Sequence, residues 1–371
     1  QTHGYTRVLN TRLSRQASSS SAAATAGGTA AAASGGEPPG SEGKHATMAA
    51  MELAGRQRRT KNRKHMAFNE EEEKSWSRPF CFIQAADTQF GMIDAFINKV
   101  DESSVTWDAE IHRTRTAIEA ANRMKPKPRF FIVCGDLIDA MPGSMHRRAQ
   151  ERDWAEVFSE LDNTIPLVCV CGNHDIGNSP NAHTIKDYET AFGSDDYFSF
   201  WCGGVFNMVL NSQFFEDSSQ APELADKHMA WIDQQLAVAK QEAATHVFIF
   251  QHIPYFLQDP KEEKQYFNLG YEFRLQMLDK FNAAGVKAIF CGHYHRNGGG
   301  VYRDMEQVVT TAVGAALGTD EPSGLRVVCV YRDRIEHQYY PLSRIPLTVD
   351  LATKESNKAQ LQNGLCKRPS S

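Results

Sequence analysis

Five short apolar runs in the middle of the chain share one pattern of hydrophobic and polar positions. Each run is rich in Phe, Ile and Val, and each ends in a polar group. Runs of this length predict strands that are buried on both faces. The five runs are residues 79–87, 129–136, 165–175, 245–252 and 286–295.

Segments with apolar residues at helical spacing lie between these runs. They are residues 107–124, 154–161, 223–243 and 271–285. Strands that alternate with helices predict an α/β domain with a largely parallel central sheet. Further strands are predicted as a hairpin over 197–201 and 205–212, and later over 307–314, 324–333 and 334–342. These additional strands indicate a second sheet packed on the first.

Both ends of the chain lack the apolar residues that a folded core needs. Residues 17–43 are mostly Ala, Ser and Gly, so they bury too little to offset the entropy of ordering. Residues 56–64 are a basic cluster that predicts a solvated linker, with a nuclear-localisation or anionic-surface role as the alternative. We therefore predict a disordered low-complexity and basic segment over 1–76, one folded domain over 77–347 and a polar tail over 348–371.

Composition narrows the function classes. The 371 residues carry a formal net charge of −5, which excludes nucleic-acid binding by bulk attraction. No apolar stretch approaches the length of a membrane span, and the first residues lack the apolar middle of a secretory signal. Most of the 8 cysteines lie inside apolar runs, as small buried hydrophobes do, so a reducing, cytoplasmic setting is expected.

The polar groups at the ends of the five apolar runs are of the types that bind metal ions. Ligands of open α/β sheets lie beyond the carboxyl ends of the strands, so these side chains are expected to meet. A single such residue at a strand end is usually a capping or turn residue. Five successive strand ends that all carry possible metal ligands predict a metal site. The candidate ligands are Asp87, Gln89, Asp136, Asn173, His252, His293 and His295.

The chemistry of these seven side chains indicates the kind of site. Carboxylate and amide oxygens with imidazole nitrogens, and no thiolate, suit Mn, Fe, Zn or Mg. Seven ligands are too many for one ion with an open position, and they suit two divalent metal ions that share a carboxylate. Two such ions clamp a phosphoryl group and generate hydroxide between them.

The motifs at the strand ends resemble the five-block signature of calcineurin-like metallophosphoesterases in order and spacing. The resemblance covers residues 78–345 and implies a metallophosphoesterase-type α/β fold, a four-layer α/β/β/α sandwich with mixed sheets. The segments DTQFG, DDYFSFWCGGV, FQHIPYF and GHYHRNGGG further resemble a group within the family that acts on serine/threonine phosphoproteins. The five blocks are ADTQ (86–89), GDLID (135–139), GNHD (172–175), FQHIP around His252, and GHYH (292–295).

The resemblance implies a role for each candidate residue. His174 would lie beside the scissile phosphate as proton donor or transition-state stabiliser, and Asp175 would orient it. A metal-bridging hydroxide would attack phosphorus in line, without a covalent phosphoenzyme. The first metal would be held by Asp87, Gln89, Asp136 and His295, and the second by Asn173, His252 and His293, with Asp136 as the bridge.

Gln89 departs from the family pattern, which has Asp-x-His in the first block. An amide oxygen is a weaker and harder donor than imidazole, so looser binding of this metal and a bias toward Mg or Mn over Zn are expected. In alternative interpretations Gln89 holds a water, or the site is degenerate and inactive.

Three features beside the motifs are candidates for substrate contact or close packing. Residues 254–270 predict a long polar loop with aromatics, a type of segment that often selects substrates. Arg296 and Asn297 directly follow the last ligand and are candidates to contact the phosphate or its leaving group. Glycines 298–300 predict either a close backbone approach to a ligand or a tight turn into the next strand.

Together these features predict a dinuclear metal-dependent phosphoesterase. The group that the chain resembles implies a phosphomonoesterase whose partners are serine/threonine phosphoproteins. A phosphodiesterase or a small-molecule phosphatase uses the same metal core, and a non-catalytic metal-binding scaffold is the non-enzyme alternative. His174 speaks against the scaffold, because metal binding does not need it. The oligomeric state is left open.

Overall fold

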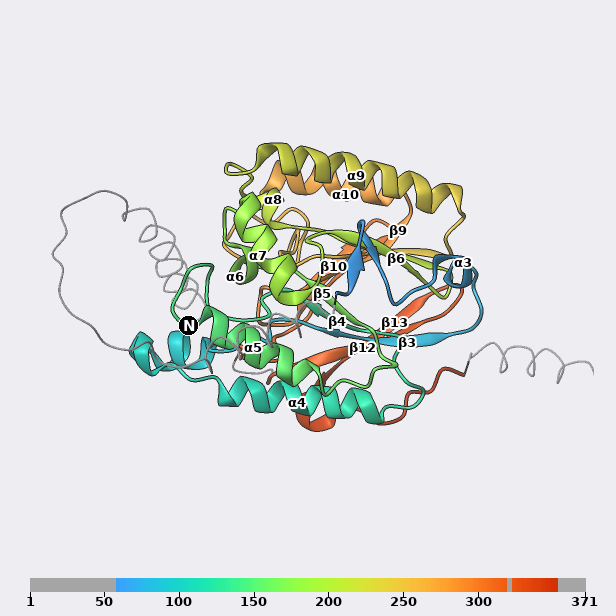
Figure 1. Ribbon diagram of the computed structural model, residues 1–371. Coiled ribbons are helices and arrows are strands. Elements are labelled where there is room, and N and C mark those ends of the chain that lie inside the picture. Colours follow the sequence, from blue (N-terminus) through green and yellow to red (C-terminus); the bar gives the residue numbers. More distant parts are fainter. Residues whose placement is uncertain (1–57, 319–321, 353–371) are drawn as a thin grey trace, which may run out of the picture. The chain divides into compact units, whose positions relative to one another are not determined.

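Two β-sheets form the middle of the computed structural model (Figure 1). The structure describes residues 58–318 and 322–352, and the predictions for residues 1–57 and 353–371 lie outside the described residues. In the five-stranded sheet β3, β4 and β5 run parallel, and β12 and β13 continue it in antiparallel order. In spatial order its strands are β13 (Ile335–Pro341), β12 (Gly324–Val330), β3 (Phe80–Ala85), β4 (Phe131–Cys134) and β5 (Leu167–Val170).

The eight-stranded sheet contains the remaining strands of the described chain. β6 and β7 form the predicted antiparallel hairpin, and β7, β8, β9 and β11 run parallel. In spatial order its strands are β1 (Thr60–Lys61), β2 (Lys64–His65), β6 (Phe198–Cys202), β7 (Val205–Val209), β8 (His246–Phe250), β9 (Val286–Cys291), β11 (Met305–Val309) and β10 (Gly298–Tyr302).

Helices cover the outer face of each sheet, which confirms the predicted four-layer α/β/β/α sandwich with mixed sheets (Figure 1). The five-stranded sheet packs on α4 (Asp108–Arg123), α5 (Arg147–Phe158) and α7 (Ala182–Phe192). The eight-stranded sheet packs on α9 (Pro222–Gln241) and α10 (Tyr271–Ala283). The shorter helices are α3 (Glu70–Glu73), the π-helix Ile93–Asn98, the 3₁₀ helices Glu102–Ser104 and Leu342–Arg344, α6 (Asn173–Ile176) and α8 (Gln213–Glu216).

Phenylalanine side chains fill the space between the two sheets. Phe82 of β3 stacks on Phe130 with ring centroids 4.5 Å apart, and it meets Phe290 of β9 edge-on at 5.5 Å. Phe250 of β8 stacks on Phe290 at 5.2 Å. Each central strand therefore has one face on this shared core and the other on helices, which explains why the strand runs are apolar on both faces.

The five site strands divide between the two sheets, whereas the sequence pattern predicted one largely parallel central sheet. β3, β4 and β5 lie in the smaller sheet, and β8 and β9 lie in the larger one. A strand buried on both faces has the same apolar pattern in either sheet, so the pattern does not reveal the division. Glycines 298–300 lie in β10, which pairs with β11, and not in a tight turn.

Residues 58–76 belong to the fold, although they lie within the segment that we predicted to be disordered. β2 pairs with β6, and Phe68 stacks on Phe200 with ring centroids 4.6 Å apart. His65 is buried, and its Nε2 lies 3.0 Å from the carbonyl oxygen of Leu167. The buried residues His65 and Phe68 lie in a segment that is rich in charged residues, so its composition did not indicate that it folds.

The cysteines lie where the apolar runs placed them. The seven cysteines within residues 58–318 and 322–352 are free thiols, and all are buried except Cys329, which is half-buried. Across the same ranges, every helix is too short or too polar to cross a membrane.

Candidate metal centre

The candidate site lies where strand ends of the two sheets meet. β3, β4 and β5 end level with one another, because Ala85 pairs with Val133 and Cys134 pairs with Val170. The strand ends of the two sheets are joined by hydrogen bonds. His252 Nδ1, after β8, donates to the carbonyl oxygen of Cys134 at 2.8 Å. The backbone N–H of His293, after β9, donates to the carboxylate of Asp87, after β3, at 3.1 Å.

The backbone turns sharply after each of these strands. Five of the seven predicted ligands have positive φ angles, a conformation that is uncommon outside glycine and costs free energy unless surrounding structure enforces it. Such turns bring side chains from the strand ends into one small volume. The five residues are Asp87 (50°), Gln89 (35°), Asp136 (48°), His293 (67°) and His295 (54°).

Two glycines in the motifs are required by close packing rather than by chemistry. A Cβ atom on Gly172 would lie 2.2 Å from Asp136 Oδ1, and one on Gly292 would lie 2.6 Å from the carbonyl oxygen of Cys134. The segments that carry Asn173 and His293 therefore approach β4 as closely as a backbone can.

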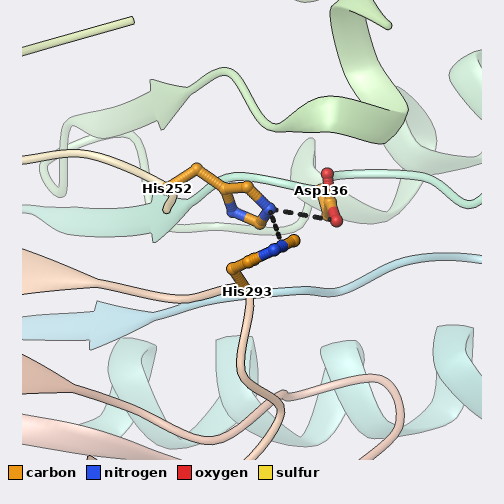
Figure 2. Close-up of side chains that lie close together, drawn as sticks. All are labelled: Asp136, His252 and His293. Carbon is orange, nitrogen blue, oxygen red and sulfur yellow. Dashed lines mark hydrogen bonds and ion pairs between the residues drawn. The ribbon is translucent and has the colours of Figure 1, made fainter. Parts of the chain in front are cut away.

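Three predicted ligands surround the imidazole of a fourth, His252, and Figure 2 shows His252 with two of them. His252 Nε2 lies 3.1 Å from Asp136 Oδ2, 3.1 Å from Asn173 Oδ1 and 3.1 Å from His293 Nδ1. Ligand atoms of Asp136, His252 and His293 all lie within 4.8 Å of one another, and the three residues are buried. The structure thus brings together the predicted second-metal group with the predicted bridging carboxylate.

Each histidine of the centre gives one ring nitrogen to a backbone carbonyl. His252 Nδ1 faces Cys134, His293 Nε2 lies 3.3 Å from the carbonyl oxygen of Tyr266, and His295 Nδ1 lies 2.6 Å from that of Ala315. A carbonyl oxygen only accepts, so each of these nitrogens carries the hydrogen. The other nitrogen of each ring then presents a lone pair to the centre, which is the arrangement of metal-ligating histidines.

This arrangement of lone pairs fits a cation. When His252 is neutral, its Nε2 and the atoms His293 Nδ1, Asn173 Oδ1 and Asp136 Oδ2 are all acceptors with no hydrogen to share. Such buried groups are costly unless a positive charge lies among them. Burial lowers the pKa of His252, but the Asp136 carboxylate outweighs it and raises the pKa to about 9. A proton therefore takes the place of the cation when no metal is bound.

The predicted first-metal group lies beside it. His295 Nε2 is 3.4 Å from Asp87 Oδ1, and burial together with the Asp136 carboxylate raises the pKa of Asp87 well above its usual value. Gln89 Nε2 donates to Asp139 Oδ1 at 3.1 Å, while its amide oxygen is buried without a hydrogen-bond partner. A buried amide oxygen without a hydrogen-bond partner fits a metal ligand, because a bound ion would satisfy it.

His174 is held by a different aspartate from the one we predicted. Its Nδ1 contacts the carbonyl oxygen of Asp139 and lies 3.6 Å from the carboxylate of that residue. Asp175 instead accepts backbone N–H bonds from Leu137 at 3.0 Å and Gly172 at 2.8 Å. The ring of His174 therefore contacts Asp139 rather than Asp175, and the carboxylate of Asp175 binds the backbone of the turn at Gly172 instead.

The charges around His174 favour its protonated form. Burial lowers the pKa of His174, but the carboxylates of Asp136 and Asp139 outweigh it and raise the pKa above the usual value. The backbone N–H of His174 also donates to Asp136 Oδ1 at 2.9 Å. The residue is thus tied to the predicted bridging carboxylate through its backbone, while its ring stays available for chemistry.

Arg147 of α5 supports the GNHD turn, and the sequence did not reveal it. Its guanidinium donates to the carbonyl oxygens of Ala140 (2.9 Å), His174 (2.7 Å) and Asp175 (2.6 Å). Its Nε donates to Glu151 at 2.6 Å, and both side chains are buried. An arginine at the start of a helix is usually solvated, and its three carbonyl partners come from other segments, so no local signal marks it.

We expect Arg147→Leu to lower the free energy of unfolding by about 3–5 kcal/mol, because it leaves three carbonyls and a carboxylate buried with fewer partners. Urea denaturation of the metal-free protein measures the loss. The control is Arg148→Leu on the next residue, whose side chain is 69% exposed and whose ion pair with Glu151 is worth below about 1 kcal/mol. Equal losses in the two variants would contradict the supporting role of Arg147.

Arg296 and Asn297 lie beside the centre with partners inside the fold. Arg296 donates to the carbonyl oxygen of Leu317 at 3.1 Å, and Asn297 Oδ1 accepts from Arg326 at 2.8 Å. Their contact with substrate stays a prediction.

The sequence matches a family of phosphoesterases and several of its curated members. A family model described as calcineurin-like phosphoesterase matches residues 82–297. The chain is 48% identical over 299 residues to "Serine/threonine-protein phosphatase CPPED1" of Bos taurus, and 47% identical over 300 residues to the Homo sapiens protein of that name. Each match covers 80% of this chain and 95% of the relative.

A solved structure shows the same fold. The dimetal phosphatase from Danio rerio, LOC 393393, superposes with a TM-score of 0.52 at 16% identity, covering 71% of this chain and 96% of that one. At this identity the likeness concerns the fold alone.

Proposed function

This chain belongs to the calcineurin-like phosphoesterase family, and we propose that it removes phosphate from phosphoserine and phosphothreonine residues of proteins. The chain is a metal-dependent phosphoesterase, as its family and its relatives indicate. The observation that carries the metal dependence is the convergence of three buried ligand atoms on a fourth, His252 Nε2, each at 3.1 Å from it. The protein substrate is proposed from the names of the relatives, which are serine/threonine-protein phosphatases.

The proposal assigns the ligands to two ions. Two divalent cations supply, when bound, the positive charge that stabilises a phosphoryl group and lowers the pKa of water. The side chains of this chain fix where that charge sits, with Asp136 between the two groups. The residues that would hold the ions are Asp87, Gln89, Asp136 and His295 for one, and Asp136, Asn173, His252 and His293 for the other.

His174 is the proposed proton donor to the leaving oxygen. Because Nδ1 of His174 faces the carbonyl oxygen of Asp139, Nε2 is the atom left to hold a proton toward the substrate. Asp139 also accepts from Gln89 Nε2, so the ring of His174 and a proposed metal ligand are held by one residue. Asp175 and Arg147 act as positioning residues, since they bind the backbone of the turn that carries Asn173 and His174.

We further propose that the enzyme works in the cytoplasm. The proposal rests on the seven free thiols of the described residues, which a reducing compartment preserves.

Removal of metal is expected to abolish hydrolysis of para-nitrophenyl phosphate, and adding back Mn or Mg is expected to restore it better than Zn. The reason is that Gln89 offers an amide oxygen where a histidine would favour softer ions. The measurement is turnover of chelator-stripped protein with Mn, Mg, Zn or Fe added singly, followed by turnover of a phosphoserine peptide.

Three results would change the proposal. Faster turnover of the bis-ester than of the monoester would indicate a phosphodiesterase. Turnover of para-nitrophenyl phosphate but of no phosphopeptide would indicate a small-molecule phosphatase. Protein that binds two metal ions and hydrolyses none of the esters would be a scaffold.

A further inference from the structure

The loop over residues 254–270, between β8 and α10, is fixed by hydrogen bonds to the half-buried carboxylate of Glu262. The carboxylate of Glu262 accepts the backbone N–H of Leu257 at 2.7 Å and of Gln258 at 3.0 Å. It also accepts from the side-chain amide of Asn268 at 2.6 Å. A segment without helix or strand is thus closed on itself by a single side chain.

Two neighbouring elements hold the same loop in place. Arg274 of α10 is fully buried and donates to the carbonyl oxygens of Glu262 at 2.6 Å and Leu269 at 2.8 Å. The glycines of β10 allow the loop to lie directly on the sheet, since a Cβ on Gly298 would lie 2.9 Å from the carbonyl oxygen of Leu257. The loop is therefore rigidly mounted, which is the condition for placing a side chain against a substrate.

The loop brings Tyr266 to the metal centre. Its ring centroid lies 5.1 Å from that of His293, and its carbonyl oxygen is the acceptor that faces His293 Nε2. The side chain of Asn173 lies close enough to the phenol to act on its pKa, against the rise that burial causes. Tyr266 thus lies against His293 and near Asn173, two proposed metal ligands, although it belongs to none of the motifs.

The phenol has one hydrogen to donate. The oxygen of the nearby Asn173 side chain already faces His252 Nε2 at 3.1 Å. Tyr266 is half-buried, whereas the next residue, Phe267, which also packs on His293, is buried. Of these two rings, that of Tyr266 is therefore the one that a substrate at the centre can reach.

We propose that Tyr266 is a substrate-contacting residue whose phenol donates a hydrogen bond to an oxygen of the phosphate group at the metal centre. This inference rests on the proposed function, because it takes a phosphate ester as the ligand of the site. The rigid loop supplies the specificity of the contact, since the phenol, Asn173 and His293 are held in one fixed arrangement.

The test compares Tyr266→Phe with the wild type and with Tyr271→Phe, which removes the phenol of an exposed tyrosine on α10. Three quantities are measured on metal-loaded protein: metal content, the Kd for inorganic phosphate by calorimetry, and kcat and KM for para-nitrophenyl phosphate. Tyr266→Phe is expected to bind phosphate about tenfold more weakly or worse, because a hydrogen bond to a charged group is lost. Its metal content and that of Tyr271→Phe are expected to match the wild type.

Two outcomes would overturn the inference. Phosphate affinity of Tyr266→Phe within about twofold of the wild type would mean that the phenol does not touch the phosphate. Loss of metal from Tyr266→Phe would make Tyr266 a positioning residue for the ligands instead. If the wild type binds phosphate but hydrolyses no ester, the proposed function fails, and the phosphate-binding comparison still decides the role of Tyr266.

Discussion

Asp136→Asn is expected to lower kcat/KM for para-nitrophenyl phosphate by more than about 1,000-fold, because Asp136 is the carboxylate that the two proposed metal groups share. The asparagine keeps one oxygen for the backbone N–H of His174, which Asp136 Oδ1 accepts at 2.9 Å. Its amide N–H would take the place of Oδ2, 3.1 Å from His252 Nε2. That N–H hydrogen would then lie beside His252 Nε2, where a cation is proposed to bind.

Metal content, measured by mass spectrometry on dialysed protein, separates this explanation from misfolding. We expect Asp136→Asn to bind fewer than two ions and to retain the far-ultraviolet circular dichroism of the wild type. Asp162→Asn is the matched control, since it removes an aspartate that pairs with Lys127 in solvent. A variant that keeps both ions and substantial turnover would contradict the bridging role of Asp136.

The candidate metal ligands could be identified from the sequence because each lies within four residues of a strand end. Each of the five runs ends at a candidate ligand or within two residues of one, and the structure gathers these residues around one centre. They are Asp87, Asp136, Asn173, His252 and His293. The α/β class followed from the same pattern, because alternating strands and helices allow few architectures, whereas the four-layer sandwich was implied by the family resemblance. A strand that is buried on both faces has the same sequence pattern in either sheet, so the sequence did not predict that the site strands belong to two sheets.

The residues that the sequence did not reveal act across long separations. Arg147 binds carbonyls of the GNHD turn, and Asp139 replaces Asp175 as the partner of the His174 ring. In the sequence Asp175 adjoins His174, but its carboxylate points back to the N–H of Gly172. Tyr266 reaches the centre from a loop whose shape depends on Glu262. Such contacts depend on how loops close, and periodicity carries no information about that.

His174→Ala is expected to lower kcat by about 100- to 10,000-fold for a phosphoserine peptide, which is the range for loss of a positioned proton donor. The loss is expected to be much smaller for para-nitrophenyl phosphate, because para-nitrophenolate leaves without a proton. Metal content is expected to stay unchanged, since the His174 ring faces Asp139 and its backbone N–H to Asp136 is kept in the variant.

The comparison of the two substrates decides the chemistry of His174. Equal losses for peptide and para-nitrophenyl phosphate would mean that His174 stabilises the charge of the transition state and donates no proton. Unchanged turnover of both would remove His174 from the reaction. The control is His183→Ala, which removes a histidine whose side chain is 83% exposed. Because a scaffold needs no proton donor, a loss that depends on the leaving group is a result that only an enzyme gives.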